Sequence, residues 1–127
     1  MRFRFEPGKG LIVGPTRLSG PSGDAIVRLA LDTGAVGTMV SSEALVTLGY
    51  DPARITERIR ITSATATEYA PQVVVARIEA LGHTRDEFTV VCHTLPPESR
   101  LDGVLGLDFP SARRLAIDFA AGILDPE

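Results

Sequence analysis

The chain has 127 residues, of which 44% are apolar and 23% charged, and its formal net charge is −3. This composition is typical of a soluble globular protein, and the length suits one domain over residues 1–127. The nearly balanced charge argues against binding to nucleic acid or to an anionic membrane, and no apolar run approaches the roughly 20 residues that span a bilayer. The single cysteine, Cys92, excludes an internal disulfide, so we expect a cytoplasmic protein.

The first predicted elements are two strands joined by a tight turn. Gly20-Pro21-Ser22-Gly23 is a turn signal between apolar segments near residues 11–18 and 24–31. In the second segment apolar residues alternate with Arg28, as in a strand with one buried face; they are Val27, Leu29 and Leu31. The pattern predicts a β-hairpin.

Two short helices are predicted further along the chain. Ser41 or Ser42 can cap a helix that runs to about Leu48 and ends at Gly49. A second helix would begin at Asp108, with Pro110 in its first turn, and end near Arg113 and Arg114.

The remaining elements are strands with period-2 alternation. Three segments share this pattern, with the expected buried sets Val74, Ala76, Ile78 and Ala80, then Phe88, Val90 and Cys92, then Leu115, Ile117 and Phe119. The segment from His93 to Arg100 contains two prolines and is expected to be a surface loop. In total the sequence predicts seven or eight short strands and two short helices, without alternation of strands and helices. This favours an all-β fold, a small antiparallel barrel that is closed or nearly closed.

A short acidic motif follows the second arm of the predicted hairpin. Asp32-Thr33-Gly34-Ala35 comes directly after apolar residues, and a carboxylate at the end of a buried strand is costly unless it is paired or used. The threonine hydroxyl can bond to backbone, and glycine lets another backbone come close. Asp-Thr-Gly alone also occurs in ordinary turns. About 70 residues downstream, however, stands a second element, Val104-Leu105-Gly106, followed by Asp108-Phe109.

In this order and spacing, the two elements resemble the retropepsin-like aspartic proteases, and the resemblance extends from about Leu11 to Leu124. It implies a small barrel of the retropepsin type with one or two short helices. It also implies that Asp32 is the catalytic acid and base, and that the Thr33 hydroxyl binds the partner's backbone. The backbone N–H of Gly34 would point toward the carboxylates. The other implied site residues hold the active-site loop or support it from beneath: Ala35, Val104, Leu105 and Gly106.

The resemblance implies an aspartic endopeptidase that works as a homodimer. The chain contains a single Asp-Thr-Gly, and its length leaves no room for a second lobe. A two-fold dimer would bring two Asp32 carboxylates together at its axis. The partners are then a second copy of the chain and a peptide or protein substrate, and no cofactor is expected.

A flap over the substrate is expected between Ile59 and Val74, with its candidate residues at Thr65, Ala66, Thr67 and Tyr69. Tyr69 could contact substrate, or it could be an ordinary half-buried aromatic residue of a strand. The segment from Ile61 to Ala70 contains no glycine, which usually lets a flap tip bend. This keeps a second hypothesis open, a catalytically inactive module of the same fold that dimerises or binds peptides.

Histidine and cysteine residues suggest no metal site. The spacing of His83, Cys92 and His93 provides neither a Cys-x-x-Cys pair nor two ligands at a helical interval. The simpler interpretation is that the two histidines lie on the surface and that the cysteine is a buried thiol. We therefore expect no bound metal.

Overall fold

The computed structural model describes residues 2–62, 65–109 and 114–126. In these ranges the strands are β1 (Phe3–Arg4), β2 (Val13–Gly20), β3 (Gly23–Leu31), β4 (Met39–Val40), β5 (Arg58–Thr62), β6 (Thr67–Ala80), β7 (His83–Cys92), β8 (Gly103–Leu105), β9 (Leu115–Asp118) and β10 (Ile123–Pro126). The helical elements there are α1 (Ser42–Thr47) and two single 3₁₀ turns, η1 (Pro52–Arg54) and η2 (Pro97–Ser99). No helix in the described ranges is both long enough and apolar enough to cross a membrane.

Six strands form a closed barrel in the order β2-β3-β8-β4-β7-β6, and β6 pairs with β2 to complete the ring. Most neighbours are antiparallel, but β3 with β8 and β4 with β7 are parallel. The predicted all-β closed barrel is confirmed. The parallel pairs were not predicted, because β4 and β8 are only two and three residues long and carry no alternation of their own.

The predicted hairpin is confirmed as β2 and β3, which pair from Val13 with Ala30 to Gly20 with Gly23. Gly23 has a φ of +125°, a conformation that L side chains rarely adopt, so the turn depends on glycine there. The Ser22 N–H donates to the Leu48 carbonyl at 2.9 Å, which ties this turn to the end of α1.

The first predicted helix is also confirmed. The Ser41 hydroxyl accepts a hydrogen bond from the Ala44 N–H at 3.2 Å, the usual contact of an N-terminal cap. Gly49, with a φ of +98°, follows the last turn. Leu45 and Leu48 are buried and attach the helix to the barrel core.

The alternation expected along β6 holds only in its second half. Ile78 and Ala80 are buried as predicted, but Val74 and Ala76 are exposed, and their places in the core are taken by Val73 and Val75. The prediction was wrong for Val74 and Ala76 because it assumed one unbroken period.

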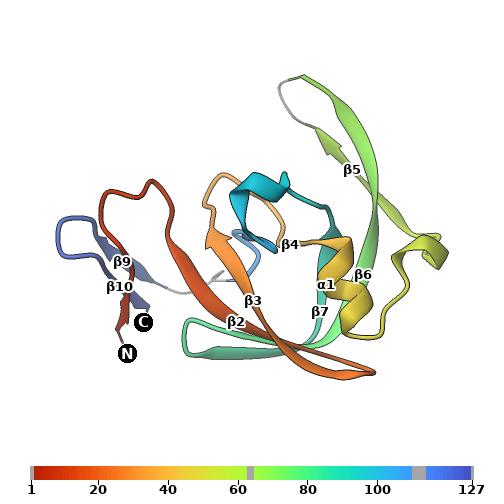
Figure 1. The fold of residues 1–127 in the computed structure, drawn as a ribbon, viewed down its shortest axis with the longest axis horizontal. Helices are drawn as coiled ribbons and strands as arrows, with labels where there is room; N and C mark the ends of the chain where they lie inside the picture. Colours follow the sequence, from red (N-terminus) through yellow and green to blue (C-terminus); the bar gives the residue numbers. More distant parts are fainter. Residues whose placement is uncertain (1, 63–64, 110–113, 127) are drawn as a thin grey trace.

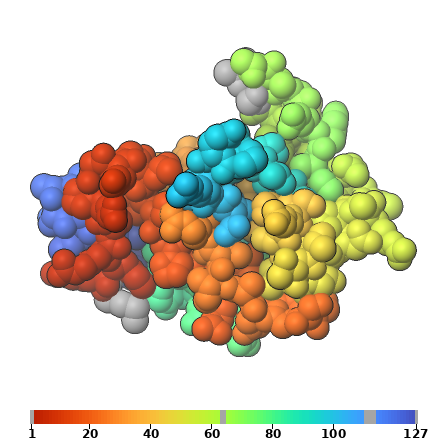
Figure 2. Space-filling model, viewed as in Figure 1, coloured from red at the N-terminus to blue at the C-terminus, as the bar shows by residue number. Residues whose placement is uncertain are grey.

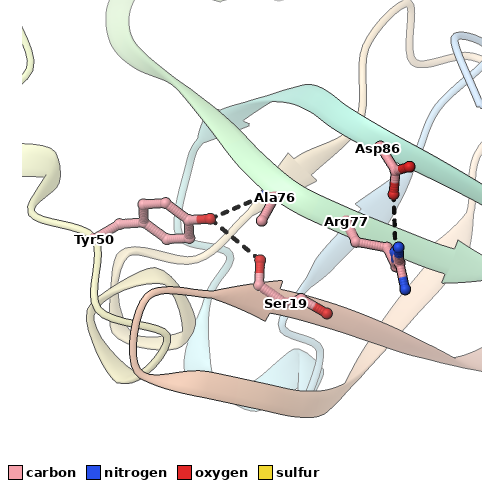
Figure 3. A network of polar contacts seen from close by, with 5 residues as sticks. All are labelled: Ser19, Tyr50, Ala76, Arg77 and Asp86. Carbon is pink, nitrogen blue, oxygen red and sulfur yellow. Dashed lines mark hydrogen bonds and ion pairs between the residues drawn. The ribbon is translucent and has the colours of Figure 1, made fainter.

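The change of face occurs at Ala76, where the pairing of β6 with β7 is interrupted. Opposite this position Glu87 has a φ of +49°. The Ala76 N–H donates instead to the Tyr50 hydroxyl at 2.9 Å, and this hydroxyl donates to the Ser19 carbonyl at 3.1 Å (Figure 3). Tyr50 therefore links β2 and β6 at the seam where the barrel closes. One position further along, Arg77 forms an exposed cross-strand ion pair with β7 (Figure 3).

The expected strand at 88–92 lies within β7, and its three predicted core residues are buried, namely Phe88, Val90 and Cys92. The last predicted strand is β9, which contains Leu115 and Ile117. Phe119 does not share their partly buried face: it lies in the turn after β9 and is 69% exposed. The loop expected from His93 to Arg100 is present, and η2 forms one turn within it.

A second, smaller sheet lies beside the barrel, in the order β1-β10-β9, and it brings the two ends of the chain together (Figure 1). On the opposite side, the hairpin of β5 and the first half of β6 extends away from the barrel (Figure 1).

Candidate active site

Asp32 lies immediately after β3, at the point where the strand leaves the barrel. Its N–H donates to the Leu105 carbonyl of β8 at 3.0 Å, and its carbonyl accepts from the Ala35 N–H at 3.1 Å, closing a tight turn. The side chain is exposed. The Gly34 N–H donates to Oδ1 of Asp32 at 2.9 Å, a charge-assisted bond that fixes the direction of the carboxylate. The backbone is thus anchored in the sheet while the carboxylate stays open to solvent.

Thr33 and Gly34 are exposed, and Ala35 is half-buried. A Cβ added at Gly34 would lie 3.2 Å from Oδ1 of Asp32, which is tight and would press on the carboxylate. Glycine at position 34 therefore lets its N–H approach Oδ1 of Asp32 without a clash of a side chain with the carboxylate. The turn brings together the motif residues that the sequence singled out.

The second predicted element lies directly against this loop. β8 runs between β3 and β4, where Val104 is opposite both Ala30 and Met39. A Cβ on Gly106 would come within 2.7 Å of the backbone of Gly37, so only glycine fits where the two segments cross.

Just after this crossing, the Leu107 N–H donates to the Ala35 carbonyl at 2.8 Å. The segment from β8 to Leu107 therefore holds the acidic turn at both ends, by the bond to Asp32 at one end and to Ala35 at the other.

Two further residues complete this support: Thr38, which the sequence did not single out, and Asp108, which was expected only at the start of a helix. Thr38 is fully buried; its N–H and its hydroxyl both donate to the Asp108 carboxylate, at 3.0 and 2.7 Å. The same hydroxyl accepts from the Gly106 N–H at 3.1 Å. One threonine side chain thus joins the ends of two loops that are about 70 residues apart in sequence.

Asp108 was predicted to cap a helix. Its carboxylate accepts two hydrogen bonds from Thr38. Residues 110–113 of the predicted helix lie outside the described part of the chain, so that helix stays a prediction. The available signal was a polar residue, Thr38, beside the apolar pair of β4. Nothing in a single sequence links that residue to an aspartate so far downstream.

The predicted flap region is a hairpin, in which β5 pairs with β6 from Arg58 opposite Pro71 to Thr62 opposite Thr67. Thr65, Ala66 and Thr67 are exposed near its tip. Tyr69 lies opposite Arg60 and is 66% exposed, so its description as a half-buried strand residue is wrong.

The histidines and the cysteine lie along β7. His83 is the first residue of this strand and Cys92 the last, and His93 follows it. At about 3.3 Å per residue the two histidines are some 30 Å apart. Burial is the main cause that raises the pKa of the Cys92 thiol, against smaller opposing effects of a hydrogen bond to Ser42 and of Arg58. Within the described ranges, no three His, Cys, Asp or Glu side chains gather as metal ligands would.

Comparison with known proteins gives the class of this site. The sequence profile of the aspartyl protease family matches residues 18–109, which include both the Asp32 turn and β8. The chain therefore belongs to the aspartyl protease family.

Among solved structures, the chain is similar to the crystal structure of a retropepsin-like aspartic protease from Rickettsia conorii. The TM-score is 0.74 at 14% identity, over 98% of this chain and 86% of that chain. At this level of identity the likeness shows the fold, which is retropepsin-like as the sequence indicated. No curated protein matches the chain in sequence.

Proposed function

We propose that the chain is an aspartic endopeptidase that acts as a homodimer, with one Asp32 carboxylate contributed by each copy. The observation that carries this proposal is the exposed carboxylate at the end of β3, held by Gly34 and anchored through β8. A protein of this family with such a turn has the group that peptide hydrolysis requires.

Dimerisation is part of the proposal, because the chain has one Asp-Thr-Gly and the reaction uses two carboxylates. Apolar side chains are exposed beside the turn, as expected of a surface that a second copy covers. Val36 is 85% exposed, and Leu11 and Phe119, which line a hollow together with Thr33, are 49% and 69% exposed. A two-fold axis near Thr33 would place the two carboxylates within reach of one water molecule.

The chemistry follows from that pairing. In aspartic proteases, two adjacent carboxylates cannot easily both ionise, so the pair holds one proton. The ionised carboxylate removes a proton from water, which attacks the peptide carbonyl carbon. The protonated one donates to the carbonyl oxygen, and a proton then passes to the leaving amine as the C–N bond breaks. The hairpin of β5 and β6 would cover an extended substrate.

The first test is peptide cleavage by the wild type and by Asp32→Asn. A diverse peptide library is incubated with each protein from acidic to neutral pH, and new termini are detected by mass spectrometry. We expect the variant to lose at least roughly 10²–10⁴-fold in rate, the usual contribution of an acid–base group. Asp24→Asn is the matched control, because Asp24 is an exposed carboxylate in the β2–β3 hairpin, where it forms an ion pair with Arg17 at 3.6 Å. Cleavage that survives Asp32→Asn would refute the mechanism.

A mixing experiment tests whether the site is shared between two copies. An equal amount of Asp32→Asn chain, exchanged into a fixed amount of wild type, should reduce activity to about half, because mixed dimers carry one carboxylate. Unchanged activity would mean that each chain acts alone. A dimer that binds extended peptides but cuts none would instead support the inactive peptide-binding module.

A further inference from the structure

A cationic pocket lies beside the candidate active site. This pocket has a volume of about 700 Å³, and its charged lining comprises Arg4, Lys9, Arg28, Arg100 and one carboxylate, Glu6. The lining therefore carries a formal excess of three positive charges, whereas the whole chain has a net charge of −3. Such a local reversal of sign is the electrostatic environment that an anionic group prefers.

Most of this positive charge is not neutralised by the protein. Lys9 pairs with Glu6 at 3.8 Å. Within the part of the chain that the structure describes, Arg4, Arg28 and Arg100 form no ion pair. Three guanidinium groups around one pocket repel one another unless an anion lies between them, so the pocket favours an anionic ligand over water.

Hydrogen bonds connect two of the arginines of the pocket, Arg28 and Arg100, to the backbone around them. The backbone N–H and carbonyl of Arg28 bond to the side chain and the N–H of Asp102, both at 2.8 Å. The Arg28 Nε–H donates to the Arg100 carbonyl at 3.3 Å, which orients the guanidinium and leaves its terminal nitrogens for a ligand. Arg100 directly follows η2, the single turn that begins at Pro97. In Figure 2 the N-terminal segment (red) and the loop around η2 (cyan) lie next to each other on the visible face.

The position of the pocket relative to Asp32 indicates which anion it takes. Arg28 precedes Asp32 by four residues on an extended segment, a distance of about 13 Å at roughly 3.3 Å per residue. The hollow of about 310 Å³ that we assign to the dimer surface is lined by Thr33 and shares Phe5, Glu6 and Leu11 with the pocket, so the pocket borders that surface. An extended peptide that leaves the Asp32 turn along β3 would reach the cations after about four residues.

We propose that this cationic pocket is a subsite for an acidic side chain of the substrate, about four residues from the cleaved bond. The carboxylate of Asp or Glu would bind the Arg28 and Arg100 guanidinium groups, and its short apolar stem would lie against Val13. In the homodimer the pocket occurs twice, so the preference would appear on both sides of the cleaved bond. The proposal rests on the peptidase function proposed above.

The test compares peptides that differ by one glutamate and one glutamine. In a series of ten-residue peptides with an uncharged background, a single Glu or Gln is moved through the positions three to five residues from the preferred cleavage site. Wild-type protein cleaves each Glu and Gln pair in competition at pH 6, where a glutamate is ionised. Asp32→Asn binds the same peptides in calorimetric titrations, which require no cleavage. If the wild type cleaves none of the peptides, no preferred cleavage site is known, and the peptides with Glu or Gln at every position are titrated.

We expect a Glu peptide to be cleaved, and to bind, about fivefold better than its Gln partner, a typical gain for a partly exposed charge-assisted contact. The ratio should fall when NaCl is raised from about 0.05 to 0.5 M. Arg28→Gln and Arg100→Gln should each reduce the ratio to about twofold or less. Arg54→Gln is the matched control, because Arg54 lies in η1, pairs with Asp51 at 3.2 Å and does not line the pocket.

The two proposals fail separately. Equal treatment of Glu and Gln peptides at every position, absence of peptide binding, or an equal loss of preference in Arg54→Gln would overturn the acidic subsite. Wild type that still cleaves peptides in that case retains the peptidase function. A Glu preference in binding, lost in Arg28→Gln, together with no cleavage by wild type, would support the subsite and overturn the peptidase function.

Discussion

Thr38→Val tests whether the buried threonine holds the active-site loop as the structure indicates. Valine has nearly the shape of threonine, so the change removes the hydroxyl with little change in packing. Two hydrogen bonds are lost, one to the Asp108 carboxylate at 2.7 Å and one from the Gly106 N–H at 3.1 Å. Thr38 is 0% exposed, so water cannot replace either partner.

The magnitude follows from those two contacts. A hydrogen bond to a charged group contributes about 1.5–3 kcal/mol, and a buried N–H left without an acceptor costs about 1–3 kcal/mol. Asp108 keeps its bond from the Thr38 N–H, which reduces the loss. We expect the free energy of unfolding to fall by about 3 kcal/mol, which for a chain of 127 residues lowers Tm by roughly 11 °C.

The assay is urea unfolding followed by circular dichroism, at one fixed protein concentration because a dimer is stabilised by mass action. Thr47→Val is the matched control: Thr47 is exposed on α1, and its hydroxyl donates to the Glu43 carbonyl one turn earlier at 3.0 Å. That variant should stay within about 0.5 kcal/mol of the wild type. If Thr38→Val is as stable as Thr47→Val, the buried hydroxyl does not hold the two loops together.

Three further predictions concern single side chains. Gly106→Ala should lower the free energy of unfolding by roughly 1–3 kcal/mol in urea, because its Cβ would overlap the Gly37 backbone; wild-type stability would show that the loops can separate. Tyr50→Phe loses both hydrogen bonds of the hydroxyl and should cost about 1–2 kcal/mol in thermal unfolding; an unchanged Tm would mean that water replaces the hydroxyl. The Cys92 thiol, whose pKa burial raises, should react with iodoacetamide at least about tenfold more slowly in the folded protein than in urea; equal rates would show that the thiol is accessible.

The sequence predicted those elements whose signals are local. The hairpin of β2 and β3 was recognised from a turn of glycine, proline and serine between two apolar runs, and α1 from its Ser41 cap and the glycine after it. Both depend on residues within a few positions of one another, so one sequence contains the whole signal. Asp32 and Gly106 were found because each lies in a short pattern of defined order.

The features that the sequence did not reveal depend on contacts between distant segments. The buried face of β6 changes at Ala76, where the backbone N–H donates to the Tyr50 hydroxyl. The pattern of apolar residues along β6 does not indicate this contact, because Tyr50 lies outside the strand. Asp108 has the local features of a helix cap, and only the fold brings Thr38 to it. The parallel pairs of the barrel form because β4 and β8 lie between longer strands. Each of these two strands has only two or three residues, too few to show a strand pattern in the sequence.

Three aspartates of this fold differ in what their carboxylates contact, and the difference separates structural carboxylates from the candidate catalytic one. The Asp102 carboxylate binds the Arg28 N–H and the Asp108 carboxylate binds Thr38, each across about 70 residues, so both hold distant segments together. The Asp32 carboxylate instead accepts from Gly34 within its own turn and remains exposed. An exposed carboxylate with one local bond adds little to stability, yet the buried contacts of Thr38 and Gly106 all converge on the loop that carries it. Rigid support beneath a side chain that does not itself stabilise the barrel is the arrangement expected when that side chain acts on a substrate.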